Sequence, residues 1–204
     1  HTAYRRQRQM CIRDRIYIVV GYLKEQFSEV LKEYQGITLI ENPYYATCNN
    51  ISSLYVARDY LENAIILDGD QIIHNERILT SEFCQSGYNS VWTSEETDEW
   101  IQTVKDGIVT ACSRVGGKCG WQLYSISRWT AEDGRKLKKH LELEFEQKHH
   151  TQIYWDDIVM FCHSEEYQLG IFEMQSADVI EIDSLEELIS LDNGYEKYRE
   201  KELA

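Results

Sequence analysis

The sequence AIILDGD at residues 64–70 decides both the fold and the candidate site of this chain. Its four apolar residues end abruptly at two aspartates around a glycine. An apolar run of this length that stops at a turn residue is typical of a strand buried on both faces of a parallel sheet. Ligands of open α/β sheets collect at the carboxyl ends of such strands. Asp68 and Asp70 would offer Mg²⁺ the oxygen ligands that it prefers, and the alternative is that both are ordinary turn residues.

The composition indicates one globular domain, because 204 residues with 43% hydrophobic content can form a core of their own. The sequence shows no secretory signal and no apolar run near the ~20 residues of a membrane span, so we expect a cytoplasmic protein without membrane insertion. A net charge of −14 argues against nucleic acid as a partner, since phosphate binding needs clustered Lys and Arg. The six cysteines lack a CxxC pair and are interpreted as reduced, mostly buried thiols of a cytosolic protein. The oligomeric state is left open.

The first fifteen residues differ in character from the rest. Residues 10–15 read MCIRDR, and one reading frame of a transposase adapter used in sequencing-library preparation translates to MCIRD followed by Arg or Ser. We therefore interpret residues 1–15 as translated adapter and residues 16–204 as the domain proper. The alternative is a natural basic arm. Without the five Arg and one Asp of residues 1–15, the rest of the chain has a net charge of −18, which strengthens the case against nucleic acid as a partner.

Hydrophobic periodicity predicts a βαβ unit at the start of this domain. A strand at 16–20, a helix at 23–34 and a strand at 37–40 follow one another closely, which favours parallel pairing of the two strands. A further helix at 51–60, with Asn49 or Asn50 as its N-cap, precedes the strand that ends at Asp68.

After Thr80 the pattern becomes mixed. We expect short strands at 88–92, 108–115, 121–129, 171–174 and 179–183, with the glycine-rich residues 116–120 joining the second and third as a hairpin. We expect helices at 130–148, 154–162 and 185–191, the last capped by Ser184. The sequence thus predicts a parallel α/β core followed by a mixed β extension and returning helices.

Carboxylates end two of the predicted strands, at Asp68 and Asp70 and at Asp183. If these strand ends meet, the carboxylates could hold one Mg²⁺ on the phosphates of a nucleotide. Asn49 and Asn50 stand where side-chain amides and a helix N-terminus could face that nucleotide. The alternative for these two residues is helix capping alone.

Aromatic residues beside acids form the second candidate set, in the segments Asp98-Glu99-Trp100 and Tyr154-Trp155-Asp156-Asp157, with Trp129 between them. Aromatic faces near carboxylates bind quaternary ammonium groups through cation–π attraction and charge. The alternative is ordinary core aromatics with solvated acids beside them.

Three histidines, His140, His149 and His150, lie toward the end of a charged predicted helix. They have no Cys or Asp at the spacing of a metal site. We therefore interpret them as solvated or helix-end residues.

Seven motifs, taken in order, resemble the sugar-phosphate nucleotidyltransferases, and most closely the bacterial CTP:phosphocholine cytidylyltransferases. They are Val19-Val20-Gly21-Tyr22, Asn42-Pro43-x-Tyr45, Asn49-Asn50-x-x-Ser53-Leu54, Asp68-Gly69-Asp70, Thr97-Asp98-Glu99-Trp100, Tyr154-Trp155-Asp156-Asp157 and Glu181-Ile182-Asp183-Ser184. The resemblance extends from Ile16 to about Leu191. It implies a Rossmann-like α/β fold of the nucleotide-diphospho-sugar transferase type, with a mixed, mostly parallel sheet flanked by helices.

The resemblance also implies roles for individual residues. Asp70 and Asp183 would be catalytic and hold Mg²⁺. The residues facing the nucleotide would be Asn49, Asn50, Ser53 and Asp68, and those receiving the amino-alcohol head group would be Trp100, Trp129, Tyr154, Trp155, Asp156 and Glu181. The implied reaction transfers CMP from CTP to phosphocholine, giving CDP-choline and pyrophosphate. The alternatives are the same chemistry on phosphoethanolamine, 2-aminoethylphosphonate or a sugar 1-phosphate, and a non-catalytic ligand-binding module.

One departure from the family pattern concerns the start of the chain. The family opens with a strand and a glycine-rich phosphate loop of the form LAAGxGxRxxPxTxxxPK, and nothing of this form precedes Ile16 in the sequence. We therefore expect this polypeptide to lack the first strand and the phosphate loop and to be inactive by itself. We also expect an unfilled place in its sheet between the strands at 16–20 and 64–67.

Overall fold

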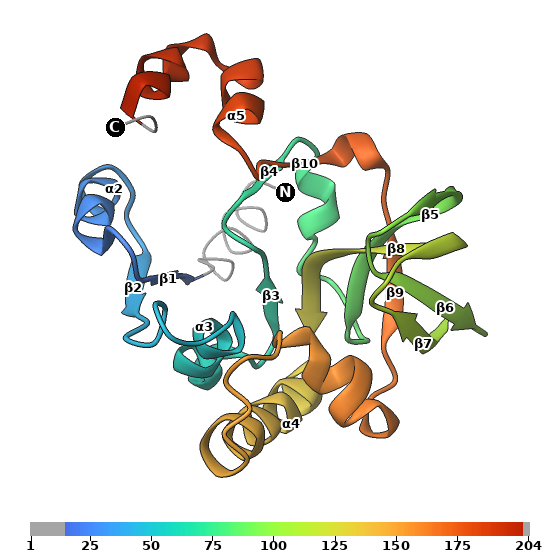
Figure 1. Cartoon of the computed structure of the whole chain (residues 1–204). Helices are drawn as coiled ribbons and strands as arrows, with labels where there is room; N and C mark the ends of the chain where they lie inside the picture. Colours follow the sequence, from blue (N-terminus) through green and yellow to red (C-terminus); the bar gives the residue numbers. More distant parts are fainter. Residues whose placement is uncertain (1–14, 202–204) are drawn as a thin grey trace, which may run out of the picture. The chain divides into compact units, whose positions relative to one another are not determined.

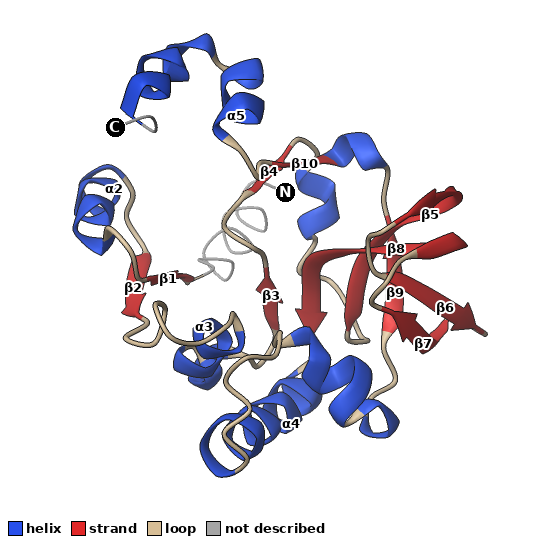
Figure 2. Cartoon of the chain, in the orientation of Figure 1, coloured by secondary structure: helices blue, strands red, loops and turns tan. Residues whose placement is uncertain are grey.

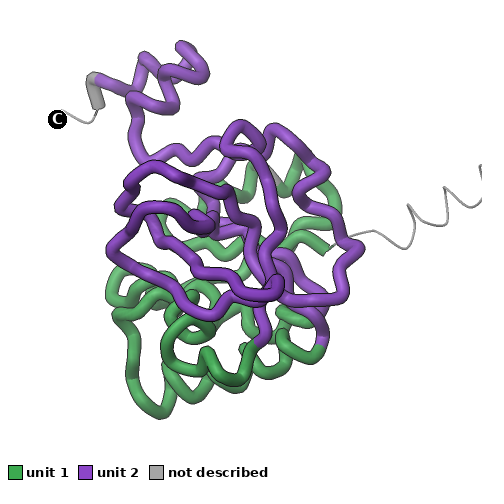
Figure 3. Tube along the Cα trace, turned by 90° about the vertical axis from the view of Figure 1, so that its right-hand side faces the viewer, with its two compact units in different colours: residues 1–62, 132–167 green, residues 63–131, 168–204 purple. Residues whose placement is uncertain are grey.

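The computed structural model describes residues 15–201, so almost all of the segment interpreted as adapter lies outside the described residues (Figure 1). The described chain contains both helices and strands, with strands β5 to β8 following one another without a helix between them (Figure 2). The chain divides into two compact units, each made of two segments (Figure 3). Unit 1 comprises residues 1–62 and 132–167, and unit 2 comprises residues 63–131 and 168–204.

The predicted βαβ unit is present in unit 1. Strands β1 (Ile16–Val20) and β2 (Ile37–Glu41) pair in parallel, and the connection carries a 3-10 turn (Lys24–Gln26) followed by helix α2 (Phe27–Glu33). The short loop after β1 contains Gly21, where an added Cβ would lie only 2.6 Å from Cβ of Tyr45. A larger residue would therefore displace the tyrosine.

The interior of unit 1 comes from its helices. They are α3 (Ile51–Val56) with a 3-10 turn (Arg58–Tyr60), α4 (Ala131–Glu142) with a π-helical turn (Leu143–Gln147), a second π-helical turn (Ile158–Cys162) and a 3-10 turn (Ser164–Glu166). Their buried apolar side chains include Ile51, Leu54, Leu137, Leu141, Ile158 and Val159. A Cβ on Gly134 would lie 2.2 Å from the carbonyl oxygen of Leu61, so α4 packs directly on the backbone at that point.

Unit 2 is built on a mixed six-stranded sheet. Its strands are β3 (Ala64–Ile66), β5 (Gly87–Thr97), β6 (Ile101–Lys105), β7 (Ile108–Ser113), β8 (Gly117–Trp129) and β9 (Gly170–Glu173). The order is β7-β6-β8-β5-β9, with β3 also paired to β8. Ile78, Ile126, Met174 and Val179 form a buried apolar cluster in this unit.

A separate two-stranded antiparallel sheet joins β4 (Gln71–Ile73) to β10 (Val179–Glu181) in unit 2. Three 3-10 turns (Glu76–Leu79, Ser176–Asp178 and Asn193–Lys201) and helix α5 (Leu185–Leu191) complete the unit. As predicted, Ser184 caps α5: its hydroxyl accepts from the backbone of Glu187, whose carboxylate accepts from the backbone of Ser184. These two hydrogen bonds fix where the helix begins.

The structure confirms a mixed α/β fold with sheets flanked by helices but corrects three details. Strand β3 pairs antiparallel with β8, so it is not a strand of a parallel sheet, and its side chains are half-buried rather than covered on both faces. Among residues 15–201 only the β1–β2 and β5–β9 pairings are parallel and five are antiparallel. Residues 116–120 do not form a hairpin between β7 and β8, because β6, which the sequence did not predict, lies between them.

Two further expectations concern membrane-spanning helices and the cysteines. No helix within residues 15–201 is both long enough and apolar enough to cross a membrane. The five cysteines in the described part of the chain are half-buried or exposed, so the expectation that most cysteines are buried is wrong. The expected unfilled place in the sheet lies between the strands at 16–20 and 64–67, which are β1 and β3. Within residues 15–201, β1 pairs only with β2, and β3 pairs only with β8.

Candidate active site

Three carboxylates, from Asp70, Glu181 and Asp183, converge in unit 2. The β4–β10 ladder brings them together, because it sets Gln71 opposite Glu181 and the Ile182 N–H donates to the Asp70 carbonyl oxygen at 2.9 Å. One carboxylate oxygen from each residue lies within 4.8 Å of the other two. All three residues are exposed, and no Lys, Arg or His among residues 15–201 forms an ion pair with them. The cluster therefore carries uncompensated negative charge.

This charge affects the protonation of the cluster. Loss of solvation, and then the negative charges of Asp70 and Asp183, raise the pKa of Glu181 to about 7. The pKa of Asp68 is also raised, mainly by burial and further by Asp70, although a hydrogen bond from Ser125 on β8 opposes the shift. A bound cation would relieve this repulsion and favour the ionised carboxylates.

The three residues fit Mg²⁺. The ion prefers hard oxygen ligands and is commonly held by one or two carboxylates together with substrate phosphates. The sequence predicted Asp70 and Asp183 for this role and assigned Glu181 to the head group, whereas the structure places Glu181 beside the two aspartates. Its position two residues before Asp183 was the available signal, because alternate residues of an extended strand share a face.

Unit 1 brings the Asn49–Asn50 segment next to residues 151–155. The Asn49 N–H donates to the Thr151 carbonyl oxygen at 2.8 Å, and the Asn50 Oδ1 accepts from the Trp155 N–H at 2.9 Å. Asn50 is the residue before α3, but its side chain makes no capping hydrogen bond. The capping alternative for Asn50 is therefore wrong, and its amide instead holds the backbone of the tyrosine-tryptophan segment.

The Ser53 hydroxyl lies beside a buried asparagine that the sequence analysis noted only as part of a motif. The Asn42 Nδ2 donates to Ser52 Oγ at 3.0 Å and to Ser53 Oγ at 3.2 Å, while its Oδ1 accepts from the Tyr44 N–H at 2.9 Å. Asn42 thus orders the loop after β2 against the start of α3.

The predicted head-group residues differ in exposure. Trp129 and Trp155 are 0% and 2% exposed, and Asp156 is also buried, so these side chains offer little free surface. Tyr154 is 49% exposed. Trp100 is half-buried, with the Arg114 guanidinium over its ring at 5.7 Å. Tyr154 and Trp100 are therefore the aromatic rings of this set that remain accessible.

The predicted site residues fall into one group in each unit. Unit 1 holds Asn49, Asn50, Ser53, Tyr154, Trp155 and Asp156, and unit 2 holds Asp68, Asp70, Trp100, Trp129, Glu181 and Asp183. Sequence reasoning missed the contribution of Ser125. It also missed Gln71, whose side-chain amide is buried with no hydrogen-bond partner in the described residues.

Comparison with solved structures places the fold among the nucleotidyltransferases. The structure is similar to that of a CTP:phosphocholine cytidylyltransferase from Streptococcus pneumoniae, with a TM-score of 0.78 and 29% identity over 87% of this chain and 77% of the other. It also resembles an inositol-1-phosphate CTP transferase from T. maritima, with a TM-score of 0.62. At 15% identity the second likeness is one of fold alone.

Sequence relatives narrow the class. A 2-aminoethylphosphonate cytidylyltransferase of Lancefieldella rimae is 33% identical over 184 residues, covering 89% of this chain and 74% of the relative. A choline-phosphate cytidylyltransferase of Streptococcus pneumoniae is 30% identical over 177 residues, covering 87% and 76%. No family model matches the chain. The chain belongs to the cytidylyltransferase family, as the sequence motifs predicted.

Proposed function

We propose that this protein transfers CMP from CTP to phosphocholine, releasing pyrophosphate, in a reaction that depends on Mg²⁺. The observation that carries the proposal is the convergence of Asp70, Glu181 and Asp183 in a chain of the cytidylyltransferase family. Bound Mg²⁺ would neutralise phosphate charge during transfer. The role of the three carboxylates is to hold the cation in a fixed place, so that the nucleotide phosphates are oriented when they bind.

The reaction needs no covalent enzyme intermediate. A phosphate oxygen of the acceptor forms a bond to the α-phosphorus of CTP, and the bond from that phosphorus to the bridging oxygen of the β-phosphate breaks. Pyrophosphate leaves with that electron pair. Positioning and electrostatic stabilisation supply the catalysis in transfers of this kind. In this proposal Asn49, Asn50 and Ser53 face the nucleotide, with Asp68 supporting the carboxylate cluster.

The acceptor that we favour carries a quaternary ammonium group. Tyr154 presents an exposed ring directly before a buried tryptophan and an aspartate. An accessible aromatic ring is the feature that cation–π recognition uses. Relatives named for choline phosphate and for 2-aminoethylphosphonate support a small acceptor that carries an amine or a quaternary ammonium group. Phosphoethanolamine, 2-aminoethylphosphonate and sugar 1-phosphates are the rival acceptors.

The test measures pyrophosphate release by the product of the complete reading frame that contains this chain. CTP and Mg²⁺ are supplied with phosphocholine, phosphoethanolamine, 2-aminoethylphosphonate or a sugar 1-phosphate in parallel. We expect the highest kcat/KM with phosphocholine and no release after chelation of the metal. A preference for 2-aminoethylphosphonate would overturn the acceptor but keep the chemistry. Binding of CTP without turnover on any acceptor would favour the non-catalytic module.

A matched pair of variants tests the ammonium site. Tyr154→Leu removes an exposed ring of the proposed site, and the control Tyr34→Leu removes another exposed ring directly after α2. We expect Tyr154→Leu to lower kcat/KM for phosphocholine more than for phosphoethanolamine, by about 5- to 30-fold, since a desolvated cation–π contact contributes about 1–2 kcal/mol. Equal losses on both acceptors would argue against an aromatic ammonium site.

A further inference from the structure

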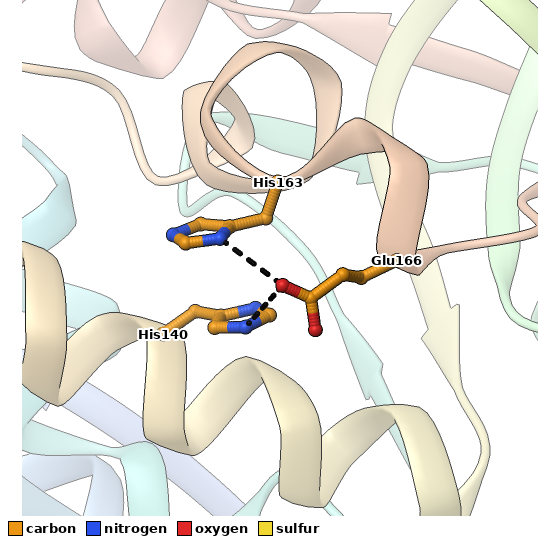
Figure 4. Close-up of side chains that lie close together, drawn as sticks. All are labelled: His140, His163 and Glu166. Atoms are coloured by element: carbon orange, nitrogen blue, oxygen red, sulfur yellow. Dashed lines mark ion pairs between the residues drawn. The ribbon is translucent and has the colours of Figure 1, made fainter.

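Two imidazoles and a carboxylate meet in unit 1, apart from the acidic residues of the proposed reaction (Figure 4). His140 lies on α4, His163 directly follows the π-helical turn at residues 158–162, and Glu166 ends the next 3-10 turn. One oxygen of Glu166 lies 3.4 Å from Nε2 of His140 and 3.5 Å from Nδ1 of His163. Both histidine side chains are only 11% exposed, whereas Glu166 is 49% exposed. His140 is therefore not solvated, although it does lie in the last turn of α4, the helix-end position that the sequence analysis offered.

In each imidazole, the ring nitrogen that does not face Glu166 has a hydrogen-bond partner. The Tyr167 hydroxyl lies 2.7 Å from Nδ1 of His140, and a carboxylate oxygen of the fully buried Glu144 lies 2.8 Å from Nε2 of His163. These contacts leave the other two ring nitrogens facing Glu166. Histidines that bind metals characteristically use the second ring nitrogen in this way, because the hydrogen bond fixes the tautomer and the orientation of the ring.

The charges of the cluster also suit a cation. Burial, and then the neighbouring His163, lower the pKa of His140, which favours the neutral ring that a metal requires. Glu144 already pairs with Lys148 and His150, whereas in residues 15–201 the Glu166 carboxylate pairs with no Lys or Arg. Glu166 is therefore the anion available to a cation at this place.

We propose that His140, His163 and Glu166 form a binding site for a divalent transition metal of the zinc type. Zn²⁺ binds imidazole nitrogen and carboxylate oxygen at about 2.0–2.2 Å, and three protein ligands leave a fourth position for water. Mg²⁺ is disfavoured here because it prefers oxygen ligands. The site therefore selects a different class of cation from the one suited to Asp70, Glu181 and Asp183.

Metal binding demands a specific rearrangement. The two rings are stacked with centroids 3.8 Å apart and planes 3° apart, but an imidazole holds a metal in the plane of its ring, so two parallel planes cannot share one ion. The rings must tilt toward each other at the edge that faces Glu166. Glu166 can follow this movement because it lies on a short, half-exposed turn.

The experiment is a zinc titration of the full chain against a chromophoric chelator, with excess Mg²⁺ and with the thiols alkylated. We expect one Zn²⁺ per chain that depends on the cluster. Glu166→Gln and His140→Gln should each weaken this binding at least tenfold. His149→Asn is the matched control, since His149 is an exposed histidine outside the cluster and asparagine tolerates its left-handed backbone, and this variant should bind zinc as the parent chain does.

Cobalt gives an independent readout. Co²⁺ at a four-coordinate site of nitrogen and oxygen ligands should produce an intense visible absorption band, and the band should be absent in Glu166→Gln. If zinc affinity and the cobalt spectrum are the same in Glu166→Gln, His140→Gln and the parent chain, the proposal is wrong. Glu166→Gln keeps the test valid even if His140→Gln fails to fold, because its side chain is half-exposed and the amide preserves hydrogen bonding to the rings.

Discussion

Each unit gathers charged side chains in one place, around Glu144 in unit 1 and at Asp70, Glu181 and Asp183 in unit 2. The negative charge is neutralised differently in the two. In unit 1, the buried Glu144 is surrounded by donors, with Lys148 at 2.7 Å, His150 at 2.7 Å and His163 at 2.8 Å. In unit 2, Asp70, Glu181 and Asp183 have only one another's negative charge as near neighbours. One cluster is balanced within the chain, and the other is balanced only when something positive binds.

The pKa values show the same difference. Burial alone would raise the pKa of Glu144, but the hydrogen bonds from its three donors outweigh burial and lower it. Glu181 has no such donors, and its pKa is raised to about 7. The carboxylate with the lowered pKa is thus the one that is paired within the fold, and the carboxylate with the raised pKa lies where the proposed cation would bind. The following predictions test this interpretation, from the largest effect to the smallest.

The largest effect should follow removal of one metal-binding charge in unit 2. Asp183→Asn should lower kcat with CTP and the acceptor by about 10²- to 10³-fold, equivalent to about 3–4 kcal/mol of transition-state stabilisation. Steady-state kinetics with the complete gene product measure it. Asp106→Asn is the control: Asp106 has a left-handed backbone that asparagine also tolerates, and its replacement should leave kcat unchanged. Equal activity of Asp183→Asn and the parent would remove Asp183 from the metal site.

In unit 1 the same kind of change should affect stability. Glu144→Gln leaves three donors facing a neutral amide inside the unit, so the free energy of unfolding should fall by about 1–3 kcal/mol. Urea denaturation at neutral pH measures this change. Glu165→Gln, on an exposed residue of the same unit, should leave the unfolding midpoint in place. An unchanged midpoint for Glu144→Gln would show that the donors do not depend on its charge.

The raised pKa of Glu181 should couple metal binding to pH. Protons and Mg²⁺ compete for this carboxylate, so the Mg²⁺ affinity of the parent chain should rise by up to about tenfold per pH unit below pH 7 and level off above it. Calorimetric titration at pH 6, 7 and 8 checks the profile. Glu181→Gln should bind more weakly and show a flatter profile. A parent affinity that is independent of pH between 6 and 8 would contradict the raised pKa.

The smallest predicted effect is a gain in the free energy of unfolding when Glu181 is neutralised in the absence of metal. Because the folded pKa of Glu181 lies above its unfolded value of about 4.5, the folded state binds the extra proton, and stability falls as pH rises from about 4.5 to 7. At pH 8 without metal, Glu181→Gln should therefore raise the free energy of unfolding by a few tenths of a kcal/mol. Saturating Mg²⁺ should reverse the order. Thermal unfolding with and without Mg²⁺ distinguishes the two cases, and a loss of stability in both would refute the repulsion.

Local signals predicted the parts of this fold that local interactions determine. The βαβ unit and the cap at Ser184 follow from short-range periodicity and hydrogen bonding, and both are present. The antiparallel partner of β3 did not follow, because strand pairing depends on contacts between residues far apart in the sequence. Strand β6 was missed because five residues beside an acidic segment give a weak pattern.

The site was predictable to a similar extent. Asp70 and Asp183 stand at strand ends, and the structure adds Glu181 beside them. The imidazole cluster was overlooked because its members come from two distant segments. The spacings His140 to Glu144 and His163 to Glu166, four and three residues apart, would each place two polar side chains on one helical face. Only the folded chain shows that the two faces meet.

The route of the chain through its two units has a consequence for folding. Because unit 1 is completed by residues 132–167 only after most of unit 2 has been synthesised, neither unit can be released by cutting the chain at one point. Residues 15–62 are synthesised before α4, with which they form one unit. Until α4 has been made, apolar side chains of this segment such as Ile51 and Leu54 stay exposed. A large sequence separation between contacting residues slows folding and favours aggregation of the incompletely folded chain. Expression yield should therefore depend more on temperature and chaperone supply than on the intrinsic stability of either unit.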